Sequence, residues 1–245
     1  MTAPERIAWE RDGFIGPFRA LPAADAEACA DELLQALSAP GRGTMNRHCD
    51  LPALARLCRA ADVWTRLSEL LGPDLVLWRT NFFLGNPRLD WHEDRHGNLI
   101  GGGFSLSAQL SLKQSDADNC TLIVPGSHRM TPEQKSARYG LEPDPREGGN
   151  VRYRGQVAGD QFMRMALQPG EAFIFHPGLL HASSGVLGER GVDSKRVSLV
   201  FRVTTPEARI APSAHADGAC PILVQGVDRH GLNTYGRWPG SAPGC

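Results

Sequence analysis

The segment DWHEDRH (residues 90–96) holds the densest group of metal-binding side chains in the sequence. If this segment is extended, the side chains of His92 and Asp94 point to one side of the chain and that of Glu93 to the other. His92 and Asp94 could then bind one metal ion, with a third ligand from a distant strand. Two histidines and one carboxylate form a facial triad that leaves positions open on Fe(II). The extended conformation therefore predicts a non-haem iron site.

A helical conformation of the same residues predicts different chemistry. His92, Glu93 and His96 match the HExxH motif, in which two histidines hold zinc and the glutamate acts as general base. The flanking residues disfavour a helix, because a proline stands at position 87 and glycines stand at 97 and 101–103. A zinc-dependent hydrolase using these three residues is therefore the alternative, and we favour the extended conformation.

The third iron ligand is expected from the later run EAFIFHPGLLH (residues 171–181). His181 is the preferred ligand because it follows a β-like run that ends at a turn, and His176 in the same run is its rival. Further along, Arg196 and Ser198 face the same way if their segment is a strand. A guanidinium and a hydroxyl together suit a carboxylate ligand. This pair is the predicted binding site for a co-substrate carboxylate, with Arg202 as the alternative arginine.

The elements that must position these residues change character along the chain. Residues 23–38 and 51–72 carry apolar residues at helical spacing. From residue 74 onward, short β-like runs are broken by Gly, Pro, Asn and Asp, and in FSLSAQLSL (residues 104–112) apolar and polar residues alternate strictly. Helices followed by many short strands predict a mainly β fold with flanking helices, either an antiparallel sandwich or a jelly roll.

We expect one domain over residues 1–245. It would comprise a helical layer over 1–73, a β core over 74–205 and a tail over 206–245 that covers the site. Residues 131–160 are polar and rich in Gly and Pro, and are expected to form a long excursion that could act as a lid.

Several other polar or aromatic residues are candidates for the site. Gln109 belongs to the polar face of its predicted strand and would contact the co-substrate if that face lines the interior. His96, Trp78, Arg79 and Asn81 lie close to the predicted metal ligands in the sequence and are candidates for substrate binding. For Trp78 a place in the core is the more common role. Arg79 would be costly to bury without an anionic partner.

The ordered set of motifs resembles the phytanoyl-CoA hydroxylase-like family of Fe(II)- and 2-oxoglutarate-dependent oxygenases. The resemblance begins at RDGFI (residues 11–15), continues through HED (92–94) and NCTLIVPGSH (119–128), and ends with Gly170-Glu171, His181 and Arg196. Cys120 stands where the family commonly has glycine. The resemblance implies a double-stranded β-helix (jelly roll, cupin-like) fold, with His92, Asp94 and His181 as iron ligands and Arg196 as the residue that binds 2-oxoglutarate.

The resemblance also implies the reaction. Fe(II), 2-oxoglutarate and O2 would together hydroxylate an unactivated C–H bond, although desaturation or ring closure stays possible. Related halogenases have Gly or Ala in place of the carboxylate ligand, so Asp94 favours hydroxylation. The segment around His92 and the short chain resemble the free amino-acid hydroxylases and halogenases of this superfamily. A small polar substrate such as a free amino acid is the expected substrate class.

Composition and charge restrict the possible partners of the protein but do not identify its function. The chain has 245 residues and a formal net charge of -1, so its charge indicates neither a nucleic-acid nor a membrane partner. Six scattered cysteines without a CxxC pair, and no signal-like N-terminus, predict a cytoplasmic protein with free thiols. A non-catalytic β-helix protein that binds a small molecule is the third possibility, and the oligomeric state cannot be read from the sequence.

Overall fold

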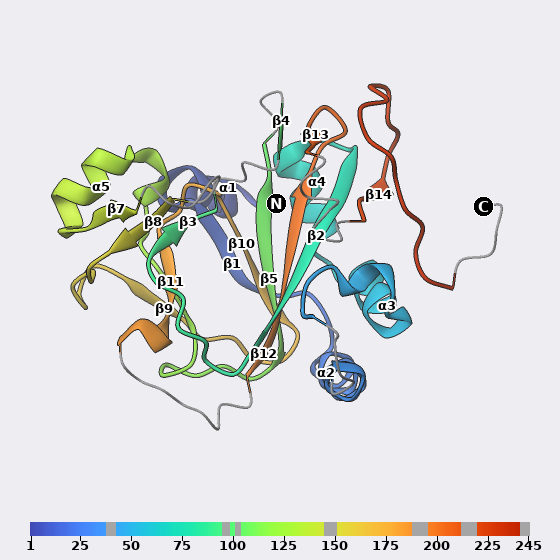
Figure 1. The fold of residues 1–245 in the computed structure, drawn as a ribbon, viewed down its shortest axis with the longest axis horizontal. Helices are drawn as coiled ribbons and strands as arrows, with labels where there is room; N and C mark the ends of the chain where they lie inside the picture. Colours follow the sequence, from blue (N-terminus) through green and yellow to red (C-terminus); the bar gives the residue numbers. More distant parts are fainter. Residues whose placement is uncertain are drawn as a thin grey trace.

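The computed structural model describes residues 1–37, 43–94, 99–100, 104–144, 151–187, 196–211 and 220–240. Two six-stranded antiparallel sheets lie face to face, and the helices lie outside them (Figure 1). The larger sheet has the order β1-β10-β5-β12-β2-β14, and the smaller sheet has the order β7-β8-β3-β11-β6-β9. This arrangement is the double-stranded β-helix that the sequence predicted.

The element bounds are as follows. The larger sheet contains β1 (Phe14–Arg19), β10 (Glu171–Phe175), β5 (Leu106–Lys113), β12 (Val197–Thr204), β2 (Leu75–Leu84) and β14 (Ile222–Gln225). The smaller sheet contains β7 (Glu142–Asp144), β8 (Val151–Arg154), β3 (His92–Glu93), β11 (His181–Ser183), β6 (Thr121–Ile123) and β9 (Met163–Met165). A separate pair joins β4 (Leu99–Ile100) to β13 (Arg209–Ile210). The α-helices are α1 (Ala3–Asp12), α2 (Ala23–Leu37), α3 (Pro52–Ala60), α4 (Trp64–Leu71) and α5 (Pro132–Tyr139), with short 3-10 turns η1 (Arg47–Cys49), η2 (Ser127–Arg129) and η3 (Ser184–Leu187).

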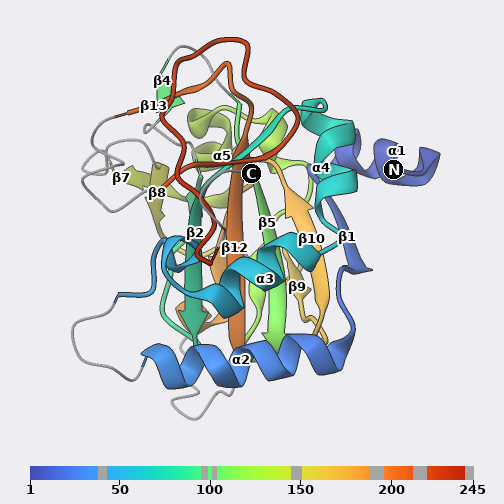
Figure 2. The same ribbon diagram turned by 90° about the vertical axis from the view of Figure 1, so that its right-hand side faces the viewer.

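Alternation along β5 divides the larger sheet into an apolar outer face and a polar inner face. Its leucines and Ala108 join the main hydrophobic cluster, which includes residues of α2, α3 and α4. These helices lie across the outer face of the sheet (Figure 2). Ser107, Gln109 and Ser111 have the opposite orientation and are also buried. These polar side chains therefore face the space between the two sheets and not water.

The space between the sheets is partly filled by apolar side chains. Phe173 and Phe175 from β10 stack with ring centroids 5.1 Å apart, and they cluster with Ile123 of β6 and Met165 of β9. A third cluster, which includes Trp91, Tyr139 and Tyr153, packs α5 against the outer face of the smaller sheet. The polar site occupies the part of the interior that the phenylalanines leave open.

The structure corrects the expected division into a helical part and a β part. The first 73 residues contribute β1, an edge strand on β10, and the tail contributes β14 on the other edge, beside β2. Gly16 and Pro17 interrupt the β pattern of β1, and Pro17 is tolerated because an edge strand leaves N–H groups unpaired. The expected helix over 51–72 is two helices, because Ala61 is extended (φ -66°, ψ 126°) between α3 and α4.

The described parts of residues 131–160, which are 131–144 and 151–160, contain a helix and two strands where composition suggested an irregular excursion. Thr131 caps α5 through a capping box with Gln134, and Gly140 ends the helix in a left-handed conformation (φ 65°). The strand β8 pairs with β3, so that Arg152 lies opposite His92. Within the described residues, this segment extends the sheet that carries the candidate metal ligands.

No helix among the described residues combines the length and apolarity that crossing a bilayer requires.

Candidate functional site

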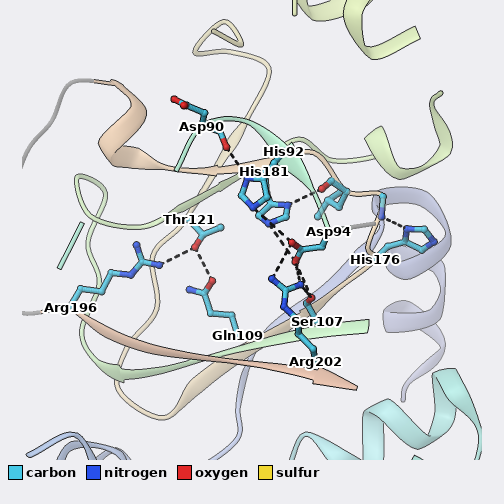
Figure 3. A network of polar contacts seen from close by, with 12 residues as sticks. Asp90, His92, Asp94, Ser107, Gln109, Thr121, His176, His181, Arg196 and Arg202 are labelled. Carbon is cyan, nitrogen blue, oxygen red and sulfur yellow. Dashed lines mark hydrogen bonds and ion pairs between the residues drawn. The ribbon is translucent and has the colours of Figure 1, made fainter. Parts of the chain in front are cut away.

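The smaller sheet brings His92 and Asp94 together with His181, which lies far away in the sequence (Figure 3). The strand β11 pairs with β3, and His181 lies directly opposite His92. Asp94 follows β3 immediately and is 1% exposed. One ligand atom from each residue lies within 4.8 Å of the other two, and no other group of three or more such residues occurs in the described part of the chain. The imidazole rings are 4.0 Å apart between centroids.

Both histidines are oriented by hydrogen bonds on the nitrogen that faces away from Asp94. Nδ1 of His92 lies 2.7 Å from the carbonyl oxygen of Asp90, and Nδ1 of His181 lies 2.9 Å from that of Leu179. A carbonyl only accepts, so each Nδ1 carries the proton and donates it. Each Nε2 then presents a lone pair, 3.9 Å (His92) and 3.8 Å (His181) from the carboxylate oxygens of Asp94. This pattern is the usual one for histidines that bind a metal.

Burial favours the uncharged form of His92. Desolvation is the largest cause, and the neighbouring His181 adds to it, so that the pKa of His92 falls to about 3. A neutral imidazole is the form that binds a metal. Two imidazoles and one carboxylate form a donor set that fits a divalent metal of the Fe(II) type.

Asp94 is held by partners on the larger sheet. Nη1 and Nη2 of Arg202 lie 2.5 Å and 3.1 Å from its two oxygens, and the Ser107 hydroxyl donates to it at 3.1 Å. Arg202 therefore fixes the plane of the carboxylate and balances part of its charge. Arg202 therefore lies at the candidate metal ligands, so its role differs from that of Arg196, the other candidate arginine.

Arg196 lies in a second polar group, apart from the three ligands (Figure 3). Its Nη2 donates to the Thr121 hydroxyl at 3.1 Å, and that hydroxyl donates to the Gln109 side chain at 2.9 Å. The Arg196 side chain is buried, and desolvation lowers its pKa to about 10. Ser198, one inward position along β12, is 1% exposed, and its hydroxyl has no hydrogen-bond partner among the described residues. A buried cation beside an unsatisfied hydroxyl is a suitable place for a carboxylate.

The three candidate ligands line one cavity together with Arg196, Thr121 and Gln109 of the second group. The space not filled by atoms at this cavity is about 440 Å³, which includes open solvent. Its walls combine the polar residues above with apolar ones from both sheets and from the loop before β3. The apolar lining residues are Phe83, Pro87, Leu89, Phe175, Ala182 and Val200.

The structure places the candidate substrate-binding residues in different surroundings. Arg79 pairs with Arg202 and Asn81 with Val200 across β2 and β12, so both share the inward side of the sheet with two residues that line the cavity. Trp78 is fully buried in an apolar cluster with Val76 and Ile210, outside the cavity lining. His96 lies outside the described residues.

Glu93 points away from the cavity, as expected for extended chain. It is fully buried on the outer side of the smaller sheet, where Lys135 of α5 lies 2.8 Å from it and the Tyr153 hydroxyl donates to it. His92 and Glu93 form a strand, not a helix. The zinc hydrolase alternative is therefore wrong about Glu93, which cannot serve as a general base at a metal on the opposite side of the sheet.

His176, the rival of His181, lies elsewhere. Its ring packs against Trp9, Phe104 and His128, with centroids 6.0, 5.1 and 5.2 Å away, and its Nδ1 accepts a hydrogen bond from the Gly178 backbone. It does not belong to the three-ligand group.

Among the residues of this site that sequence reasoning did not single out are Thr121, Ser107 and Phe175. Thr121 lies in the NCTLIVPGSH run, and strand alternation from Ile123 would have placed it inside. Ser107 belongs to the same inward face as Gln109. For Phe175, no sequence pattern distinguishes a cavity wall from the core.

Comparison with known proteins agrees with this fold and site. Residues 9–191 match the phytanoyl-CoA dioxygenase (PhyH) family, so the chain belongs to that family of non-haem iron oxygenases. No curated protein matches the sequence significantly.

Several solved structures have the same fold. The non-heme monooxygenase ThoJ in its apo form has a TM-score of 0.74 and 23% identity, and the match covers 96% of this chain and 88% of that one. CytC3 with Fe(II) and alpha-ketoglutarate has a TM-score of 0.71 and 20% identity, covering 97% and 94%. EctD from S. alaskensis, with 2-oxoglutarate and 5-hydroxyectoine, has a TM-score of 0.62 and 18% identity, covering 86% and 78%. At these identities the likeness establishes the fold.

Proposed function

We propose that this protein is an Fe(II)- and 2-oxoglutarate-dependent dioxygenase that hydroxylates a C–H bond of a small polar substrate. The observation that carries the proposal is the pairing of two groups in one cavity. His92, Asp94 and His181 form a metal-binding triad, and Arg196 and Ser198 form a separate carboxylate site. The solved relatives support the cofactors, since CytC3 was determined with Fe(II) and alpha-ketoglutarate.

The spacing of the two groups suits 2-oxoglutarate. Thr121 lies opposite Ser183, two residues along the strand pair from His181 and its partner Ile123. Two residues of a strand span roughly 7 Å, about the length of a five-carbon dicarboxylate. Arg196 would hold the distal carboxylate while the 2-oxo acid end reaches the metal ligands. Gln109 would orient Thr121 toward the same carboxylate.

Iron held by the triad would supply open coordination positions for the 2-oxo acid and O2, and the oxidising power for C–H hydroxylation. The protein's own residues do the rest. Arg202 holds Asp94 in one orientation, and the two carbonyl-bound imidazoles keep their Nε2 atoms on the cavity side. The apolar wall of Phe83, Phe175 and Val200 excludes water and limits the space in which a substrate carbon can lie.

The proposal also includes the chemical class of the substrate. Arg79 and Asn81 share the inward face beside the metal group, so a substrate with a carboxylate or another polar group would find partners there. The mixture of charged, polar and apolar side chains in the lining suits a free amino acid or a derivative of one. EctD, which shares the fold, was determined with the hydroxylated small molecule 5-hydroxyectoine.

A substrate panel tests the function directly. Purified protein with Fe(II), 2-oxoglutarate and O2 is incubated with single amino acids and simple derivatives, and succinate release and product mass are recorded. We expect one class to raise succinate release and to gain one oxygen atom. An isomer of unchanged mass would indicate epimerisation, the reaction named for SnoN, which also has this fold. Failure to bind iron or 2-oxoglutarate at all would favour a non-catalytic binding protein.

The two arginines predict separable defects. Arg196→Met removes the cation at the carboxylate site, and losing one partner of a buried charge pair costs about 2 kcal/mol or more, roughly 30-fold in Kd. We expect that loss in 2-oxoglutarate affinity, measured by calorimetry on the metal-loaded protein, with metal affinity unchanged. Arg202→Met is the matched control and should alter metal affinity first, because Arg202 contacts Asp94. The reverse pattern would assign 2-oxoglutarate to Arg202.

A further inference from the structure

A pair of cysteines lies outside the lining of the cavity, at the junction between η1 and the C-terminal tail. Cys49 ends η1, and Cys220 lies just before β14. Sγ of Cys49 lies 3.6 Å from the carbonyl oxygen of Cys220 and 3.5 Å from Nε2 of His48. Both residues are partly exposed. The Cys49 sulfur therefore contacts the Cys220 residue, 171 positions later in the sequence, at a place that a small oxidant can reach.

The surrounding residues hold the two cysteines in this position. Nε2 of His48 lies 3.0 Å from the Cys220 carbonyl oxygen, and Nδ1 of His48 lies 2.9 Å from the Thr80 hydroxyl of β2. His48 is fully buried. The backbone N–H of Gly236 bonds the Pro221 carbonyl at 2.8 Å, and a Cβ at Gly236 would clash with the Cys220 sulfur. The tail therefore crosses directly over this thiol.

We propose that Cys49 and Cys220 form a reversible disulfide that fastens the C-terminal tail to η1 and β2. The oxidant is hydrogen peroxide or another peroxide. The sulfur of Cys220 attacks one peroxide oxygen, the O–O bond breaks, and the hydroxide that leaves takes up a proton to become water. The sulfur of Cys49 then attacks the Cys220 sulfenic acid, the S–S bond forms, and the S–O bond breaks. The departing hydroxide takes the Cys49 proton, so two thiols and one peroxide give one disulfide and two waters.

The chemistry of the two sulfurs supports this order. The neighbouring Cys49 side chain lowers the pKa of the Cys220 thiol, which favours the thiolate form that attacks a peroxide. The same contact raises the pKa of Cys49, which stays protonated until the second step. Cys220 is thus the attacking sulfur and Cys49 the resolving one.

A second cysteine pair provides an internal control. Cys29 and Cys58 lie on the packed helices α2 and α3 and are close enough to influence each other. Burial raises the pKa of Cys29 to about 11 and that of Cys58 well above its usual value. This pair should stay reduced under conditions that oxidise Cys220.

The experiment uses the full chain with Cys245→Ser, so that the terminal thiol cannot compete. Metal-free, reduced protein is exposed to hydrogen peroxide at neutral pH, free thiols are blocked, and non-reducing digests are analysed by mass spectrometry. We expect a Cys49–Cys220 linked peptide two hydrogen atoms lighter than its parts, reversed by dithiothreitol. It should form at least about tenfold faster than any change at Cys29.

Variants complete the test. Cys220→Ala should abolish the linked peptide and slow peroxide consumption, Cys49→Ala should leave Cys220 as a sulfenic or more oxidised acid, and Cys29→Ser should change neither. Circular dichroism confirms that each variant folds. Limited proteolysis of the tail should be slower in the oxidised protein. The proposal is overturned if Cys49 and Cys220 stay unlinked while other thiols oxidise, or if Cys29→Ser prevents the link.

Discussion

Replacing His181 by alanine should abolish iron binding and catalysis together. His181 is buried in β11, its Nδ1–H is bonded to the Leu179 carbonyl, and its Nε2 faces Asp94 at 3.8 Å. Loss of a residue that merely orients a metal ligand costs about 10- to 100-fold in affinity or activity, and loss of a ligand should exceed that range. We therefore expect Fe(II) affinity to fall by more than about 100-fold.

The measurement is an anaerobic titration with Fe(II) and 2-oxoglutarate. Wild-type protein should develop a visible charge-transfer band that the His181→Ala variant lacks. The matched control is His176→Ala, which removes a histidine from the same segment but from a different environment, packed against Trp9 and His128. That variant should keep the band. A wild-type protein without the band would contradict the iron site itself, and a band lost only in His176→Ala would reassign the ligand.

Replacing Lys135 by methionine should strongly destabilise the fold. Lys135 and Glu93 are both fully buried, with Nζ 2.8 Å from the carboxylate, and Nζ also donates to the Gly178 carbonyl at 2.9 Å. Removing one partner of a buried ion pair leaves an uncompensated charge and costs about 3–5 kcal/mol. Because Glu93 lies between His92 and Asp94 in sequence, its displacement should also weaken metal binding.

Urea unfolding measures the loss of stability, with a companion metal titration. Lys113→Met is the matched control, because Lys113 pairs with Asp31 at 2.7 Å on the surface and should contribute only about 0–1 kcal/mol. The double variant Lys135→Met/Glu93→Gln removes both charges and should recover part of the stability lost by Lys135→Met. Equal losses in the Lys135 and Lys113 variants would show that the buried pair adds nothing special.

Local sequence patterns were enough to predict most of the site. The extended spacing of His92 and Asp94 predicted that both face one way and that Glu93 faces the other, because side chains alternate along a strand whatever surrounds it. The same rule predicted that Arg196 and Ser198 share a face and that Gln109 belongs to a polar one. Helices before strands, with turn residues between the strands, predicted an antiparallel sandwich or a jelly roll, and the family resemblance implied the jelly roll.

Other features depended on contacts between distant residues. The choice of His181 over His176 follows from the pairing of β11 with β3, which no local pattern specifies. The ion pair between Arg202 and Asp94 forms only because the two sheets face each other. Arg196 lies in the other polar group of the cavity. Edge strands β1 and β14 were missed because strand pairing, rather than local composition, makes these short segments extended.

The sequence by itself determined which side chains point together along each strand, since that depends only on backbone geometry. The tertiary structure decided which strands meet, and therefore which polar faces enclose a cavity instead of facing water. Because these polar faces enclose a cavity, Ser107, Gln109 and Thr121 are parts of a site and not solvent-exposed polar residues. It also brought Cys49 and Cys220 into contact, a pairing between the two ends of the chain that only packing can specify.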